Sequence, residues 1–255
     1  MVSAEAPCLA AEGVRVTFDG LTAIADLSLE VPRKRITGLI GPNGAGKTTA
    51  VNVMSGFQKP SAGRVVMDGE DLVGLRRFVV RRRGLARTFQ GGRLFRDLSV
   101  IDNLEVTGVG LGLSRREAAR RAAEMLDWMG IGALRDRQAG TLPYTDERRV
   151  AIGRALMMEP GYLLLDEPAA GMTEPEAQDL AGLVRRIVAE TGCGVLLIEH
   201  NIGLVLDLCE MIYVLDSGKV IEQGTAEVIR TSETVRHAYM GTAEDIDPAS
   251  AEMLL

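Results

Sequence analysis

The sequence has few cysteines, no long apolar run and no excess of positive charge. Its three cysteines, Cys8, Cys193 and Cys209, lie far apart and form no metal-binding or redox pair, so we expect packing residues in a reducing compartment. A formal net charge of −6 excludes a general basic field for nucleic acid, and no nucleic-acid partner is expected. No apolar stretch approaches the ~20 residues of a membrane-spanning helix, and Met1–Gly13 lacks a signal-peptide pattern. These absences predict a cytosolic chain that reaches a membrane only through a partner.

The most informative segment that is present is a glycine-rich run, which directly follows the apolar, strand-like Ile36–Ile40. Its predicted phosphate-binding residues are Asn43, Gly44, Ala45, Gly46, Lys47, Thr48 and Thr49. Glycines let the backbone curl until several N–H groups face one anion, and the next helix points its N-terminal dipole at the same place. Lys47 would bring a positive charge to the β- and γ-phosphates, and the Thr48 hydroxyl is a ligand for Mg²⁺. A simple glycine turn would not require Gly-Lys-Thr at its end, so the run predicts a nucleotide-binding loop.

A second candidate site lies at the end of the apolar segment Tyr162–Asp166, where Glu167 follows Asp166 directly. A buried parallel strand delivers such residues to the carboxyl edge of a sheet, where α/β proteins bind ligands. Asp166 would hold Mg²⁺, and Glu167 would orient or deprotonate the water that attacks the γ-phosphorus. A strand end with two solvated acids is the alternative, and it would be favoured without the glycine-rich loop. Together with that loop, the pair predicts a site of phosphate chemistry.

Three further candidates depend on their context. Gln90 lies at the junction with a helical stretch, where its amide would sense the γ-phosphate or Mg²⁺, although a lone glutamine is usually a surface residue. His200 follows the strand-like Gly194–Ile198 and would donate to the γ-phosphate, whereas an isolated histidine is more often structural. Phe18 precedes a turn and would stack on adenine, with packing in the core as the alternative.

Strand-like and helix-like segments alternate along the chain in an α/β pattern, which one mainly helical stretch interrupts. Helix-start patterns at Ser99 and Ser114, each with an acid three residues later, lie in this stretch. We therefore expect a nucleotide-binding core formed by residues 1–90 and 150–255, and an inserted helical subdomain formed by residues 91–149. With 255 residues, of which 46% are hydrophobic, the chain is large enough for both.

Five segments of the chain follow a known order: the loop 41–49, Gln90, Leu142–Arg149 ahead of a helix, Asp166-Glu167, and His200. In this order and approximate spacing, they resemble the ATPase subunits of ABC transporters over nearly the whole chain. Four shorter motifs are Arg87–Gln90, Arg93–Phe95, Glu167–Gly171 and Ala238–Gly241. These motifs resemble, more narrowly, the ATPases of branched-chain amino acid importers.

The resemblance implies a P-loop NTPase (RecA-like) core with an antiparallel β subdomain and an inserted α-helical subdomain. It also implies ATP and Mg²⁺ as ligands, bound where one subunit's phosphate loop meets the signature segment of another. The implied partners are a second ATPase subunit, identical or different, transmembrane permease subunits that dock near Gln90 and, indirectly, a substrate-binding protein. The implied location is the cytoplasmic face of the cell membrane, and the implied cargo is branched-chain or other amino acids or amides.

The signature segment departs from the family pattern, which reads Leu-Ser-Gly-Gly-Gln or Leu-Ser-Tyr-Gly-Gln. Leu142 and Tyr144 fit, but Pro143, Thr145 and Asp146 replace the serine, the second glycine and the glutamine. Pro143 removes a hydroxyl and an N–H, and Thr145 adds a β-branched side chain where backbone must approach phosphate. Tyr144 and Thr145 remain the candidate contacts to a partner's nucleotide. Thr145 is also a good N-cap, so the segment predicts a helix start as well.

These observations leave three functions open. The first is an ATP-hydrolysing importer subunit. A heterodimer would have one competent site, completed by the partner's signature, and one impaired site, whereas a homodimer would have two impaired sites. The second is a soluble ABC ATPase, a class that commonly carries two nucleotide domains or long insertions. The third is an ATP-binding regulatory subunit with weak hydrolysis, and the presence of Glu167 argues against it.

A basic cluster stands out in this acidic protein. Its members are Arg76, Arg77, Arg81, Arg82, Arg83 and Arg87. A solvated face is one interpretation, and contact with lipid headgroups or an acidic permease loop is the other.

Overall fold

The computed structural model describes residues 7–89 and 92–240, so the predicted site residue Gln90 lies outside the described residues. The strands are β1 (Cys8–Phe18), β2 (Leu21–Pro32), β3 (Ile36–Ile40), β4 (Ala62–Met67), β5 (Glu70–Asp71), β6 (Leu85–Arg87), β7 (Tyr162–Asp166), β8 (Gly194–Ile198), β9 (Met211–Asp216) and β10 (Lys219–Gly224). The α-helices are α1 (Lys47–Met54), α2 (Arg77–Arg82), α3 (Val100–Gly110), α4 (Arg115–Trp128), α5 (Tyr144–Leu156), α6 (Glu174–Thr191), α7 (Ile202–Leu208), α8 (Ala226–Thr231) and α9 (Glu233–Met240). Two short 3₁₀ helices are η1 (Gly132–Leu134) and η2 (Ala139–Thr141).

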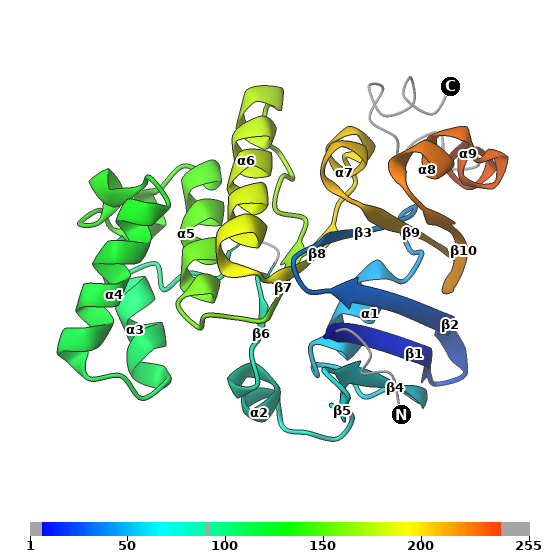
Figure 1. Cartoon of the computed structure of the whole chain (residues 1–255), viewed down its shortest axis with the longest axis horizontal. Helices are drawn as coiled ribbons and strands as arrows, with labels where there is room; N and C mark the ends of the chain where they lie inside the picture. Colours follow the sequence, from blue (N-terminus) through cyan, green and yellow to red (C-terminus); the bar gives the residue numbers. More distant parts are fainter. Residues whose placement is uncertain (1–6, 90–91, 241–255) are drawn as a thin grey trace.

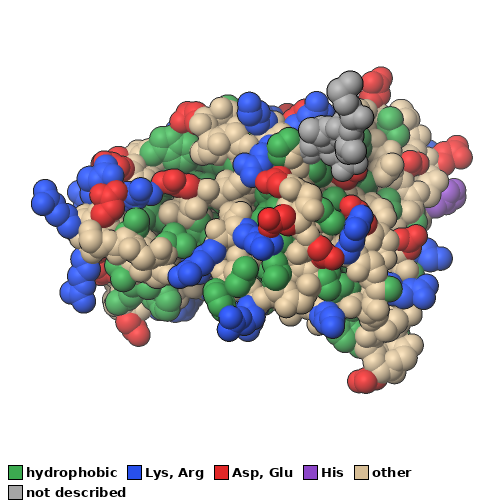
Figure 2. Space-filling view, turned by 60° about the horizontal axis from the view of Figure 1, so that its bottom comes forward, with side chains coloured by type: hydrophobic (Ala, Val, Ile, Leu, Met, Phe, Trp, Pro, Cys, Tyr) green, Lys and Arg blue, Asp and Glu red, His purple; other side chains and the backbone are tan. Residues whose placement is uncertain are grey.

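The described strands form one sheet, in the order β5-β4-β1-β2-β10-β9-β3-β8-β7-β6. At one end β1 pairs antiparallel with β2 and β4, whereas β9, β3, β8, β7 and β6 are parallel neighbours. Figure 1 shows α3 and α4 at the opposite end of the molecule from β1, β2 and β4. The face in Figure 2 carries acidic and basic side chains interspersed, in keeping with the mixed composition. The predicted α/β fold with an antiparallel β portion is confirmed.

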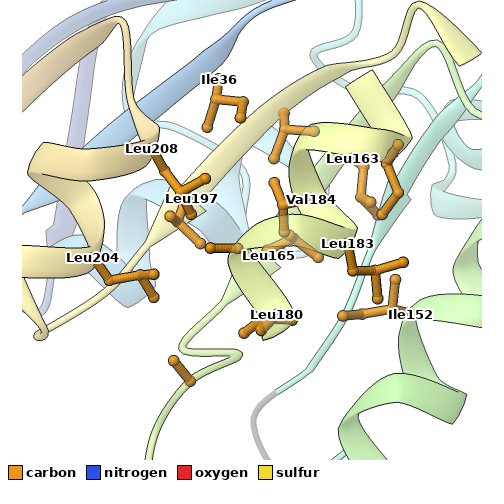
Figure 3. Packing of buried hydrophobic residues seen from close by; sticks show 14 of the residues in the cluster. Ile36, Ile152, Leu163, Leu165, Leu180, Leu183, Val184, Leu197, Leu204 and Leu208 are labelled. Atoms are coloured by element: carbon orange, nitrogen blue, oxygen red, sulfur yellow. The ribbon is translucent and has the colours of Figure 1, made fainter. Parts of the chain in front are cut away.

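The central strands are buried on both faces. Leu163 and Leu165 of β7 pack with Leu183 and Val184 of α6 on one face, as Figure 3 shows. Leu164, between the two β7 leucines, belongs to the cluster on the other face. Side chains alternate between the faces of a strand, so a strand covered on both sides reads as a continuous apolar run. This explains why the segment before the two acids is wholly apolar.

The helical stretch begins as predicted. The Ser99 hydroxyl accepts from the Asp102 N–H at 3.2 Å, and the Asp102 carboxylate accepts from the Ser99 N–H at 3.3 Å. At Ser114 only half of the predicted box forms, because the Glu117 carboxylate pairs instead with Arg120 and Arg121. An ion pair on the helix face thus competes with the reciprocal cap.

Helix α5 runs through position 149, so the proposed division of the chain at residues 90 and 149 stays a prediction. Cys193 and Cys209 are buried and Cys8 is half-buried, all as free thiols, which agrees with a packing role. Within residues 7–89 and 92–240, no helix combines the length and the apolarity needed to cross a membrane.

Candidate functional site

Three parallel strands end at one level of the sheet. Ile198 of β8 is the register partner of Leu39 in β3 on one side and of Asp166 in β7 on the other. The residues that follow each strand therefore leave the sheet side by side. These are the glycine-rich loop after β3, Glu167 after β7, and the segment with His200 after β8.

The glycine-rich loop has the curled backbone that its sequence predicts. Gly46 has φ +106° and lies so close to the neighbouring strand that a Cβ would come within 2.8 Å of the Ala23 carbonyl oxygen. Gly44 has φ +77°, and a Cβ there would meet nothing within 4 Å. The loop is therefore fixed on its inner side at Gly46, while Asn43 and Gly44 remain exposed to a ligand.

Lys47 begins α1 and is buried, with its ammonium held over the loop. Nζ donates to the carbonyl oxygens of Gly41 at 2.6 Å and of Pro42 at 2.9 Å. Burial lowers the pKa of Lys47, and the negative charge of Glu167 opposes this shift. Helix α1 has no side-chain N-cap and no acid in its first turn, so its N-terminal N–H groups and this ammonium suit an anion such as phosphate. The fit of the loop to a nucleotide rests on these features.

Asp166 does not stand free at the end of β7. Its carboxylate forms a buried ion pair with Arg87 at 2.8 Å, and both side chains are less than 10% exposed, at 8% and 7%. The same guanidinium donates to Asn52 at 2.7 Å and to Ser55 at 3.1 Å. The interpretation of the basic cluster as one solvated face is therefore wrong for Arg87. β6 pairs in parallel with β7, which carries Arg87 inward beside Leu164, a pairing that a charge count does not reveal.

Glu167 and His200 come together although they lie on different loops. His200 Nε2 is 3.0 Å from Glu167 Oε1. Glu167 has φ +49°, which is uncommon for a residue other than glycine, and its N–H donates to the Ile198 carbonyl at 2.9 Å. The structure thus brings the proposed base and the proposed γ-phosphate donor into one hydrogen bond, while their roles stay predictions.

The donors available for Mg²⁺ are a hydroxyl and a carboxylate. Thr48 is exposed at the start of α1, and Asp166 ends a strand that shares the neighbour β8 with β3. Oxygen ligands of this kind, completed by phosphate oxygens and water, suit Mg²⁺ better than a cage of side chains. Among the described residues no group of three or more His, Cys, Asp or Glu side chains forms such a cage.

Glu199 is a residue that sequence reasoning missed. It lies at the end of β8, is 2% exposed, and accepts from the backbone N–H of Ala169 at 2.6 Å. Burial raises its pKa to about 7, against the opposing effect of backbone N–H groups that donate to the carboxylate. The available signal was a carboxylate that directly follows an apolar buried strand.

The predicted adenine residue Phe18 and the signature residue Tyr144 lie at exposed positions, and Thr145 is half-buried. Phe18 ends β1 with 43% of its surface exposed, and Tyr144 is 44% exposed. Thr145 was expected to cap α5, but the N-cap is Pro143, so Thr145 lies in the first turn. Its hydroxyl donates to Glu176 at 2.8 Å, because α6 begins close enough to accept it there. This hydrogen bond ties the signature segment to α6, the helix that follows Glu167.

A groove of about 700 Å³ lies between α2, β6, α3 and α5. Phe57, Phe78 and Phe95 line it and are 43–51% exposed. Arg77 stacks on Phe57 at 4.9 Å, so cationic and aromatic surfaces are mixed there. The remaining guanidiniums in its wall include Arg81 and Arg154, and burial lowers the pKa of both. Most of the basic cluster therefore belongs to a groove with aromatic walls.

Comparisons with known proteins agree with this geometry. The family model described as ABC transporter matches residues 24–170. The high-affinity branched-chain amino acid transport ATP-binding protein BraF of Pseudomonas aeruginosa is 39% identical over 252 residues, covering 93% of this chain and 99% of that protein. LivG of Salmonella typhimurium, with the same description, is 40% identical with the same coverage. A solved ATP-binding cassette of an ABC transporter in its ADP conformation has a TM-score of 0.84 and 29% identity, covering 92% of this chain and 99% of that one.

The ion pair at Asp166 gives a first prediction. Arg87→Met removes the cation but leaves the carboxylate buried, and we expect a loss of about 3–5 kcal/mol in the free energy of unfolding, measured in urea. Arg82→Met, at an exposed position of the same cluster, is the matched control and should change stability by less than about 0.5 kcal/mol. Adding Asp166→Asn to Arg87→Met should recover part of the loss, and a double variant as unstable as the sum of both single variants would contradict the pairing.

The raised pKa of Glu199 gives a second prediction. Between the ordinary value of 4.5 and the folded value of about 7, the folded chain binds more protons than the unfolded chain, so stability falls as pH rises through this window. The contribution of this carboxyl should decline by about 3 kcal/mol across it. Urea unfolding of the wild type and of Glu199→Gln at matched pH isolates the effect, since other titrating groups are common to both. A difference between the two proteins that does not change with pH would refute it.

Proposed function

Because the chain belongs to the ABC transporter family, we propose that it is the ATP-binding and ATP-hydrolysing subunit of a membrane importer. The observation that carries this proposal is the common ending of β3, β8 and β7, which gathers the phosphate loop, His200 and the Asp166-Glu167 pair at one edge. The transport function named for BraF and LivG supports an importer subunit over a soluble ABC ATPase. They also support amino acids as the cargo of the assembly.

The residues of the edge divide the chemistry of ATP hydrolysis among them. The loop N–H groups and Lys47 bind the phosphates, Phe18 stacks on adenine, and the carboxylate of Glu167 orients the attacking water and takes its proton. His200 shares a hydrogen bond with Glu167 and donates to the γ-phosphate. Thr48 and Asp166, together with the predicted ligand Gln90, would hold Mg²⁺, which would supply positive charge to the phosphate oxygens. A subunit that only binds ATP for regulation would not need a carboxylate that activates water. The presence of Glu167 therefore supports hydrolysis.

The second half of the site comes from another ATPase subunit. In this family the signature segment of one chain faces the nucleotide of the other, and here it offers Tyr144 and Thr145. Pro143 supplies no hydroxyl, and the hydroxyl of Thr145 is engaged by Glu176. We therefore favour a heterodimer in which a partner with an intact signature completes the site at Lys47, while the opposite site is impaired.

Hydrolysis should depend on that partner. The isolated chain should turn ATP over about 100-fold more slowly than its complex with a paralogous subunit that carries an intact signature. Both sites between two copies of this chain would lack the phosphate donors of an intact signature. In the complex, Glu167→Gln should abolish turnover and retain ATP binding. The pair Pro143→Ser and Thr145→Gly should raise the activity of the isolated chain. Vigorous hydrolysis by the isolated wild type that Glu167→Gln abolishes would contradict an impaired signature.

The groove between α2, β6, α3 and α5 suits a permease segment on the cytoplasmic face of the membrane. Its aromatic walls offer apolar surface, and the neighbouring charges of Arg81 and Arg154 favour a carboxylate between them. Arg87 lies in the wall of the groove and also forms the ion pair with Asp166, the proposed Mg²⁺ ligand. A segment bound in the groove would therefore contact the residue that orients this ligand. This position supports coupling between the transport pathway and the ATP site.

Charge reversal tests the groove. Arg77→Glu with Arg82→Glu should abolish co-purification of the chain with its permease, since both side chains line the groove. Arg115→Glu with Arg116→Glu, exposed at the start of α4, makes the same change in charge outside the groove and should leave co-purification intact. Equal loss in both pairs would show a general effect of charge and would contradict this docking site.

A further inference from the structure

A single buried carboxylate holds the two loops that carry the proposed hydrolytic residues. Glu199 Oε1 accepts from the Ala169 N–H at 2.6 Å, and Oε2 accepts from the His200 N–H at 3.2 Å. The N–H of Asn201 also donates to this carboxylate. Ala169 lies in the loop after β7, whereas His200 and Asn201 lie after β8, so the carboxylate bridges two loops through their backbones.

Two other links join the same loops. The Glu167 N–H donates to the Ile198 carbonyl at 2.9 Å, and Glu167 Oε1 lies 3.0 Å from His200 Nε2. Glu199 closes a ring with them, since Ala169 is two residues beyond Glu167 and His200 directly follows Glu199. The hydrogen bonds that Glu199 accepts from Ala169, His200 and Asn201 all come from backbone N–H groups, so its carboxylate acts on loop geometry.

The backbone at Glu167 needs such support. A residue other than glycine at φ +49° is in the sparsely populated left-handed region and holds this conformation only where its surroundings impose it. The ladder bond to Ile198 fixes the N–H of Glu167, and the bond from Ala169 to Glu199 fixes the backbone two residues later. Burial of a carboxylate is costly, so packing alone does not account for an acid at this position.

We propose that Glu199 is a positioning residue for ATP hydrolysis, whose carboxylate fixes both loops so that Glu167 and His200 stay in contact. The inference deepens the proposed hydrolysis at Glu167 and rests on it. Glu199 acts through the backbone N–H groups of its neighbours. Its effect should therefore fall on the chemical step and leave ATP binding at the phosphate loop unchanged.

Glu199→Gln tests this role with the smallest change in shape. The amide oxygen can still accept one N–H, but the amide nitrogen then faces the N–H groups on the other side. In the complex with a partner ATPase subunit, we expect single-turnover hydrolysis of ATP to fall by about 10- to 100-fold, as small misplacements of reacting groups do. The dissociation constant for ATP should change by less than about twofold, which would assign the effect to the chemical step and not to ATP binding. Glu210→Gln, half-exposed and paired with Arg35, is the matched control and should keep wild-type values.

Amide hydrogen exchange gives a readout that does not depend on activity. The Ala169 N–H or the His200 N–H, whichever then faces the amide nitrogen, should exchange at least about tenfold faster in Glu199→Gln than in the wild type, as expected for the loss of a buried hydrogen bond. If the variant does not fold, exchange in the wild type tests the proposal instead. A protected Ala169 N–H supports the positioning role of Glu199, and one that exchanges like an exposed loop amide overturns it.

The outcomes separate the inference from the function beneath it. Normal single-turnover hydrolysis in Glu199→Gln, or an equal fall in ATP affinity and turnover, overturns the positioning role while Glu167→Gln remains inactive. Wild-type hydrolysis in Glu167→Gln instead overturns the proposed base, and the positioning role with it. A selective loss of turnover together with faster exchange at Ala169 or His200 supports the proposal.

Discussion

Leu39, Ile198 and Asp166 are register partners across three neighbouring parallel strands, so the chain leaves the sheet at one level three times. Neighbouring parallel strands run in the same direction, so the residues that follow their carboxyl ends lie along one edge of the sheet. Close packing on both sheet faces holds this register, because a slip by one residue would exchange the side chains between the two packed faces and disturb both. The position of the phosphate loop relative to Glu167 follows from that hydrogen-bonded alignment.

The three acids at this edge have different partners, and the partners define their roles. Asp166 pairs with a guanidinium, from Arg87, which keeps the carboxylate oriented inside the protein. Glu167 faces the imidazole of His200 and is the most exposed of the three acids, with 16% of its side chain exposed. Glu199 is buried among backbone N–H groups and acts on the loops. Under the proposed function, these carboxylates would serve a metal, a proton and the backbone respectively, because burial and partners differ at each.

Local patterns predicted the parts of this site that depend on adjacent residues. The loop Gly41–Thr49 and the Asp166-Glu167 pair were both evident, since glycines, a lysine and an apolar strand lie next to one another in the chain. The ion pair of Arg87 with Asp166 spans 79 positions and depends on the pairing of β6 with β7. The bond from Ala169 to Glu199 likewise needs the pairing of β7 with β8. Such contacts are set by sheet order, which composition and periodicity do not encode.

The start of α5 joins the substituted signature to this arrangement. Glu176 accepts from the hydroxyls of Thr145 at 2.8 Å and Thr173 at 2.7 Å, so one carboxylate fastens the first turns of α5 and α6 together. A glycine in place of Thr145 would give up this bond and free the backbone for close approach to phosphate. The substitution thus strengthens a contact within the chain where a nucleotide contact to a second subunit is expected. Under the proposed function, the chain holds its own ATP site firmly and depends on its partner to complete it.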